Sequence, residues 1–339
     1  MRLDFTNARL GARRARLTSR DGLVALLTRA STEARIDLVR AGAAGAALPA
    51  GALPAGPEGL TAVEAALRGG LAAEADALLR QVDGSRARRL LAAWLELDEA
   101  EAVKVVVRGV LGGEPVDAVL AAAPATPGLP RETLRAAVAG ASVEAALGVL
   151  AAAGSAAALA ARTAWEAQER ARPALLPVEI AADRAALARA FQVARGRCED
   201  AFVLRAHLAD RVDARNAATL LALGAGTPAA DPFLPGGHRL AQEALRKLAL
   251  APPEVRRERL ASVLRVPPKA LASPALADLT LERATVAPLR RQARLRPLSL
   301  AVPLAYLAER RAEVRRIALG LRGAEMGLPG DELLALVEA

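Results

Sequence analysis

The segment LAYLAERRAEVRRI, residues 304–317, and its continuation to residue 329 predict one long helix followed by its end. Apolar residues recur at steps of three and four, so they fall on one stripe of a helix: Leu300, Leu304, Leu307, Val314, Ile317 and Leu321. The charged residues between them point in other directions: Glu309, Arg310, Glu313, Arg315 and Arg316. We therefore expect a helix with a core side and a charged side.

Two residues do not suit a regular amphipathic helix at this place. Arg311 lies on the apolar stripe, so its side chain must either extend outward to water or meet a carboxylate of a neighbouring element. We expect the outward orientation. Pro303 lacks the N–H that a helix interior needs, so it predicts either a kink or a later start of the helix.

This segment resembles the C subunit of the bacterial and archaeal V/A-type ATPases, which is related to the d subunit of the eukaryotic V-type enzymes. The shared features, found without a gap between residues 304 and 329, are a Leu-Ala-Tyr start, a charged middle that ends in Glu-Val, an Ile, and Gly-Leu-Pro before a short closing helix. Looser similarities are Asn7-Ala8-Arg9 at the start, Asp213-Ala214-Arg215-Asn216, and Phe233-Leu234-Pro235-Gly236-Gly237. Together these similarities are sparse over the whole chain and close together only in its last third.

The resemblance implies a non-catalytic rotor subunit, shaped as a funnel-like helical socket. Such a subunit links the membrane proteolipid ring to the central stalk and transmits torque during ion-coupled ATP synthesis or hydrolysis. It lies in the cytoplasm, peripheral to the inner membrane, as a monomer within the larger complex. ATP chemistry and ion transport then belong to other subunits, so no cofactor is expected here.

Composition favours an all-α protein. The chain has 339 residues, and its hydrophobic content of 53% comes mostly from Ala, Leu and Val, with only two Trp, one Tyr and four Phe. Small side chains allow helices to pack closely. The best β-branched run, residues 103–107, lies inside a helical pattern.

Segments rich in Pro and Gly divide the chain into three helical units. The breaks are residues 41–59, 112–130 and 224–237, and the predicted units are residues 1–115, 116–225 and 226–339. Three helix starts are expected from capping residues: Ser19, Ser31, and Thr61 with Glu64 as a capping box.

A loose threefold pseudo-repeat relates the units. Each ends in a helix with an aromatic ring, then an acid, then aliphatic residues and a Gly; the acids are Asp98, Asp213 and Glu313. Two interpretations stay open. The acids form a threefold charged rim, or each pairs with a nearby basic residue, as Glu313 does with Arg316 three positions later.

The net charge of +9 suits an acidic partner, but it suits a solvated surface equally well. Few aromatic residues are present to stack on bases, so nucleic acid is not the expected partner. The N-terminal arginines allow the same two interpretations: Arg9, Arg13, Arg14, Arg16 and Arg20. The alternative function is a freestanding helical-repeat adaptor that binds an acidic protein or nucleic acid through such faces.

No motif predicts catalysis, a metal or a phosphate loop, so an enzyme is the least favoured class. His207 is expected to be half-buried on a helix, whereas His238 follows a Pro-Gly-Gly turn without a nearby acid in sequence. The free Cys198 fits a reducing compartment. We expect neither a signal segment nor a membrane-spanning helix.

Asp213 and Asn216, one helical turn apart, are expected to form hydrogen bonds between elements. The residues predicted to have a structural or partner-contact role are Asn7, Arg9, Arg13, Asp98, Asp213, Asn216, Tyr306, Glu309, Arg311, Glu313, Arg315 and Gly327.

Overall fold

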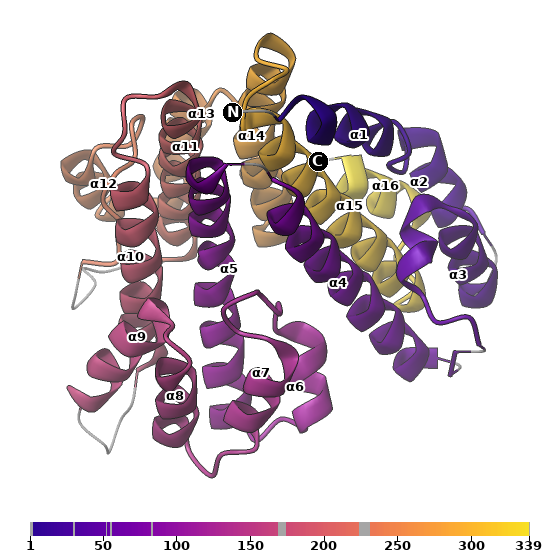
Figure 1. Cartoon of the computed structure of the whole chain (residues 1–339), viewed down its shortest axis with the longest axis horizontal. Helices are drawn as coiled ribbons and strands as arrows, with labels where there is room; N and C mark the ends of the chain where they lie inside the picture. Colours follow the sequence, from indigo (N-terminus) through magenta and orange to yellow (C-terminus); the bar gives the residue numbers. More distant parts are fainter. Residues whose placement is uncertain are drawn as a thin grey trace.

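The computed structural model describes residues 3–29, 31–51, 53–54, 56–82, 84–168, 174–223 and 231–338, and within them every regular element is a helix. The all-α prediction is therefore confirmed. In chain order the elements are α1 (Asp4–Arg14), α2 (Arg20–Leu27), α3 (Thr32–Ala41), η1 (Ala43–Ala47), α4 (Gly56–Gln81), α5 (Ser85–Gly112), α6 (Val116–Ala122), α7 (Arg131–Val138), α8 (Val143–Ala152), α9 (Ala156–Glu166), α10 (Leu175–Val193), α11 (Glu199–Ala222), α12 (Gln242–Ala249), α13 (Pro253–Leu264), η2 (Pro268–Leu271), α14 (Pro274–Leu295), α15 (Ala301–Glu325) and α16 (Gly330–Glu338) (Figure 1).

Six long helices form a closed ring. They are three consecutive pairs, α4 with α5, α10 with α11, and α14 with α15, and each helix packs on the next in this order until α15 packs on α4. The shorter helices cover the ring from outside. In Figure 1, α1, α2, α3 and α16 lie beside α15, α6 to α9 lie near α5 and α10, and α12 and α13 lie near α11.

The three connections within these pairs lie at one end of the molecule, which we call the connection end. The Asn7 side chain of α1 donates to the Pro297 carbonyl at 2.9 Å, in the connection between α14 and α15. The Asp200 carboxylate of α11 accepts from the Leu300 backbone N–H at 2.7 Å. Thr6 reaches the Gln81 carbonyl at the end of α4 at 3.3 Å. These bonds join the starts of α1, α11 and α15 to the end of α4.

The structure confirms two of the three predicted helix starts. Ser19 and Ser31 accept hydrogen bonds from the backbone N–H groups of Gly22 and Ala34 at 3.1 and 3.2 Å. The capping box at Thr61 is wrong, because α4 begins five residues earlier, at Gly56. Pro57 is tolerated in this first turn, where its missing N–H has no helical partner anyway.

The predicted breaks are shorter than expected. The first contains the short helix η1, and the second contains α6, which begins directly after Pro115. Of the third, residues 224–230 lie outside the described residues, and 231–237 are non-helical. The unit boundaries and the threefold repeat stay predictions.

The long C-terminal helix begins two residues before Pro303 and not after it. Helix α15 begins at Ala301, so the ring of Pro303 occupies the first turn, where it displaces no hydrogen bond. The helix ends at Glu325, and Gly327 has φ +72°. The Leu328 N–H then reaches back to the Gly323 carbonyl at 2.9 Å, a helix end that a left-handed glycine permits.

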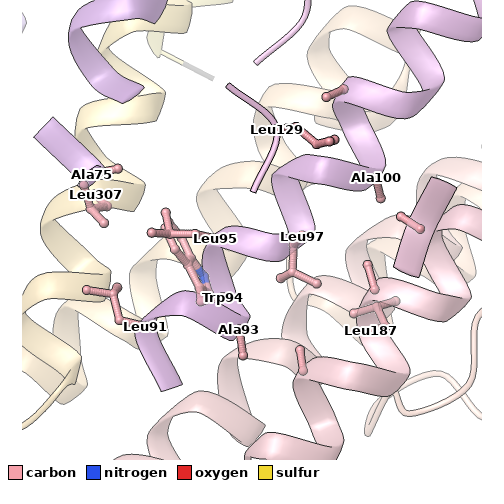
Figure 2. Close-up of a cluster of buried hydrophobic side chains, with 14 of the residues drawn as sticks. Ala75, Leu91, Ala93, Trp94, Leu95, Leu97, Ala100, Leu129, Leu187 and Leu307 are labelled. Atoms are coloured by element: carbon pink, nitrogen blue, oxygen red, sulfur yellow. The ribbon is translucent and has the colours of Figure 1, made fainter. Parts of the chain in front are cut away.

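Buried apolar side chains join the ring helices to α7, α8 and α9 outside the ring, and two further apolar clusters are separate from this one. Trp94 on α5 is 1% exposed and lies among buried leucines and alanines of several helices. Figure 2 shows these side chains of α5 between Leu307 of α15 and Leu187 of α10. Alanines of α10, such as Ala182, Ala186 and Ala190, are at most 4% exposed, as expected for helices in close contact.

Candidate functional site: a charged central cavity

A cavity of about 740 Å³ lies in the centre of the six-helix ring. Each long helix contributes residues spaced by three or four positions, which fall on one face of a helix. On α11 these include His207, Arg211 and Arg215, and on α15 they include Leu307, Arg311 and Arg315. The helical period therefore brings a single stripe of each helix to the cavity.

The cavity is closed toward the connection end. The lining begins at Trp94 on α5, nine residues after the helix start, and at His207 on α11, eight residues after its start. Nearer the connections the space is filled by fully buried leucines: Leu90, Leu91, Leu204, Leu300 and Leu304. The ring is therefore a cup whose base is a packed apolar layer.

The cavity wall carries six arginines and six carboxylates: Arg68, Arg211, Arg215, Arg311, Arg315, Arg322, Glu64, Asp98, Glu101, Asp183, Asp278 and Glu282. Most of these charges are paired across helices. Arg322 of α15 binds Glu64 of α4 at 2.6 Å, and Arg215 of α11 binds Asp183 of α10 at 3.2 Å. The wall is charged but nearly neutral in sum.

Arg211 is the exception on this wall. Among the described residues it has no ion pair or hydrogen bond of its own, although Asp98, Glu101 and Asp183 lie near enough to affect its charge. Burial, and then the positive charge of Arg311, lower the pKa of the Arg211 guanidinium. Arg211 is not among the residues predicted from the sequence, although His207, Arg211 and Arg215 lie four positions apart and so share one stripe of a helix.

Arg311 does not extend outward, and this prediction is wrong. Its guanidinium pairs with Asp98 of α5 and lies 4.8 Å from the centre of the Trp94 ring. The reason is that α15 is enclosed by other helices, so the outward direction leads into the cavity, where a carboxylate and an aromatic face are available. Burial raises the pKa of the Asp98 carboxyl, against the opposing effect of Arg311.

His207 is buried rather than half-buried. It is 4% exposed, and its ring centre lies 6.3 Å from that of Trp94. Burial, followed by the charges of Arg211 and Arg311, lowers the pKa of His207 to about 3. The ring is therefore neutral at physiological pH. His238 lies elsewhere, 48% exposed, with Nε2 3.5 Å from Asp210.

Three of the five charged residues on the predicted charged side of α15 are buried, and Arg315 and Arg316 are half-buried. Glu309, Arg310 and Glu313 are 5%, 3% and 4% exposed. Helices α1, α4 and α14 cover this side, and buried charges persist only when they are paired. Arg315 also pairs, with Asp278 and Glu282 of α14.

The partners on this side form what we call the α15 network. Glu309 binds Arg14 of α1 through two bonds of 2.7 Å, and it also binds Arg290 of α14. Glu74 of α4 accepts from the Tyr306 hydroxyl at 2.7 Å and from Arg310 at 3.3 Å. Burial, and then this carboxylate, raise the pKa of Tyr306.

Glu313 completes the α15 network. It accepts from Arg310 at 2.6 Å, and not from Arg316 as predicted, and also from the Thr18 backbone N–H at 2.6 Å. With Asp98 on the cavity wall and Glu313 bound to Thr18 in the link between α1 and α2, the three acids of the pseudo-repeat have different surroundings. A shared charged rim is therefore not formed.

Asp213 and Asn216 hold a loop, as expected from their spacing. The Asp213 carboxylate accepts from the backbone N–H groups of His238, Arg239 and Leu240 at 2.9 to 3.2 Å. Asn216 donates to the Leu234 carbonyl at 2.9 Å and accepts from its N–H at 2.7 Å. Residues 234–240 are thereby fixed on α11.

The N-terminal candidates lie on α1. Asn7 is buried and binds the connection after α14, whereas Arg9 is exposed and lies 5.7 Å from the Phe5 ring centre. Arg13 is half-buried, near enough to Tyr306 to affect its pKa. Only Asp98, Arg311 and Arg315 of the predicted residues meet at the cavity.

Among the described residues no helix is both long enough and apolar enough to cross a bilayer. In the same ranges no cluster of His, Cys, Asp and Glu has the arrangement of a metal site.

The sequence model of the family described as ATP synthase (C/AC39) subunit matches residues 6–336. A search of curated proteins found no match.

Proposed function

The chain belongs to the ATP synthase (C/AC39) subunit family, a component of rotary ATPase complexes, and from that premise we propose that it is a non-catalytic rotor subunit of a V/A-type ATPase. In this proposal it is a socket that links the membrane proteolipid ring to the central stalk and transmits torque. It acts on the cytoplasmic side of the membrane, without crossing the bilayer itself.

The observation that carries the proposal is the cup-shaped cavity with Arg211 in its wall. A guanidinium enclosed without a carboxylate of its own is costly, and an acidic side chain of an inserted partner would offset that cost. Such a contact, made in a desolvated pocket, has the character of a binding hot spot. A stalk tip that carries an exposed acid is the partner this cavity suits.

Rigid walls support a role in torque transmission. Helices α5 and α10 are joined by Arg108 and Glu179 through two bonds of 2.6 and 2.7 Å. The buried Lys104, 2% exposed, joins the same helices by binding Asp183 at 2.9 Å. Because packed interiors deform little, a load applied at the cavity is passed to the base of the cup.

The test is direct binding of purified central-stalk subunits from the same organism, measured by titration calorimetry. We expect Arg211→Gln to weaken binding about 30-fold, equivalent to ~2 kcal/mol for the loss of a desolvated charge pair. The matched control is Arg131→Gln, which removes the same charge from the exposed start of α7. Equal affinity of the two variants for the stalk would show that Arg211 does not contribute to the interface.

Copurification from native membranes tests the wider proposal. Tagged chain should recover the proteolipid ring and the central-stalk subunits, identified by mass spectrometry. If wild-type chain binds no stalk subunit and recovers no ring, the rotor-socket function is overturned. Recovery of an unrelated acidic protein or of nucleic acid instead would favour the freestanding adaptor.

A further inference from the structure

Large apolar side chains are exposed at the connection end. Phe5 of α1 is 72% exposed, Leu295 at the end of α14 is 66% exposed, and Leu298 just beyond it is 65% exposed. Phe202 in the first turn of α11 is 49% exposed. The bonds from Asn7 to Pro297 and from Asp200 to Leu300 place these elements beside one another. Four exposed apolar groups therefore share one end of the molecule.

The same end is strongly basic. Residues 3–9, 84–89, 193–202 and 291–300 contain nine arginines but only three carboxylates, those of Asp4, Glu199 and Asp200. Asp200 is buried and bound to the Leu300 N–H, and Glu199 pairs with Arg296 at 2.9 Å. Within these four described ranges, little acidic charge is thus left to neutralise the arginines.

Cationic and apolar groups alternate closely on this surface. The Arg9 guanidinium lies 5.7 Å from the Phe5 ring centre, and that of Arg296 lies 5.5 Å from the Phe202 ring centre. Three further arginines, Arg195, Arg197 and Arg294, are exposed and have no ion pair among the described residues. A protein surface with charged groups beside apolar side chains is suited to the boundary between lipid headgroups and acyl chains.

We propose that the connection end binds a bilayer surface directly, with its arginines on anionic lipid headgroups and with Phe5, Leu295 and Leu298 inserted among them. A nucleic acid would satisfy the arginines but would leave the two leucines against water and phosphate. An anionic bilayer satisfies both sets of groups. This contact goes beyond attachment to the rotor ring, because lipid alone is sufficient for it.

Cosedimentation of the full chain with vesicles tests the proposal. We expect strong binding to vesicles of equal parts phosphatidylcholine and phosphatidylglycerol, and little to phosphatidylcholine alone. Each arginine near an anionic surface contributes about fivefold to partitioning. The triple variant Arg195→Gln, Arg197→Gln and Arg294→Gln should therefore bind ~100-fold less.

A matched triple variant controls for the loss of charge alone. Arg29→Gln, Arg131→Gln and Arg259→Gln change three exposed arginines outside the connection end, and this variant should bind vesicles nearly as well as the wild type. The apolar part is tested with Phe5→Ser and Leu298→Ser, which should abolish the binding that persists at ~0.5 M salt, where headgroup charge is largely screened.

Three results would overturn the proposal. They are absence of vesicle binding by the wild type, equal loss in both triple variants, and stronger binding to duplex DNA than to anionic vesicles at the same salt. The vesicle experiment tests the lipid contact separately from the rotor-socket function. If the chain recovers ring and stalk subunits but ignores vesicles, the lipid contact is refuted and the rotor role stands.

Discussion

The α15 network and the cavity wall both enclose charges, but they differ in how completely those charges are paired. Glu309 and Arg310 each have two partners on α1, α4, α14 or α15, and Glu313 binds Arg310 of α15 and Thr18 in the link between α1 and α2. Arg211, on the cavity wall, lies near Arg311 and has no carboxylate of its own within the described part of the chain. Burial of charge therefore does not by itself mark a binding site in this protein. We propose instead that the charge left without a partner, Arg211, marks the binding site.

Breaking the α15 network should have the largest effect. Arg310→Met leaves Glu313, whose side chain is 5% exposed, without its cation, and loss of one partner of a buried pair costs about 3–5 kcal/mol. The free energy of unfolding from urea denaturation measures this. The double variant Arg310→Met with Glu313→Leu should recover about half of the loss. A loss under ~1 kcal/mol would show that the network contributes little.

Acid should destabilise the cavity wall through His207. The folded pKa of about 3 lies below the ordinary value of 6.5, so between these values the unfolded chain binds the extra proton. The contribution of His207 to the free energy of unfolding is therefore fully present above pH 6.5. Below that pH it falls by about 1.4 kcal/mol per pH unit. Unfolding of wild type and His207→Leu, measured between pH 7 and 4, should give a shallower slope for the variant. Parallel slopes would contradict the prediction.

Removing Arg211 should change folding stability little, in contrast to Arg310. Arg211→Gln gives up no direct ion pair among the described residues and relieves repulsion from Arg311, so we expect a change within about 1 kcal/mol of either sign. Urea denaturation of this variant beside Arg310→Met makes the comparison quantitative. A loss as large as that of Arg310→Met would mean that Arg211 is part of the fold and is not held for a partner.

The smallest expected effect on the free energy of unfolding comes from a surface ion pair. Lys247 binds Glu243 at 2.7 Å on α12, with both side chains more than three quarters exposed. Lys247→Ala should cost about 0.3–0.5 kcal/mol, and less at high salt. Thermal unfolding at two salt concentrations checks this, and an effect that grows with salt would contradict a simple screened pair.

Local features of the chain were predictable from sequence. Ser19 and Ser31 cap helices because their hydroxyls bond N–H groups three residues away, and Pro303 and Gly327 mark the beginning and end of α15 for equally local reasons. The Thr61 prediction failed because Pro57, although a helix breaker in an interior, also suits a first turn.

The site was less predictable, because its partners are distant in sequence. Arg311 meets Asp98 across 213 positions, and Arg14 meets Glu309 across 295. No periodicity encodes which helix lies opposite a charged residue. The lone Arg211 was missed for the same reason, since a guanidinium is identified as unpaired only after all its neighbours are placed.

The sequence by itself determined the helical class, a few helix ends and the resemblance to a rotary ATPase component, since these depend on spacing, capping and composition. The tertiary structure alone decided which charges are buried, which are paired and where the cavity lies. Closure of the ring by contact between α15 and α4 turned the charged side of α15 into an interior surface. Ion pairing depends on distances between elements, and those distances exist only once the helices are packed.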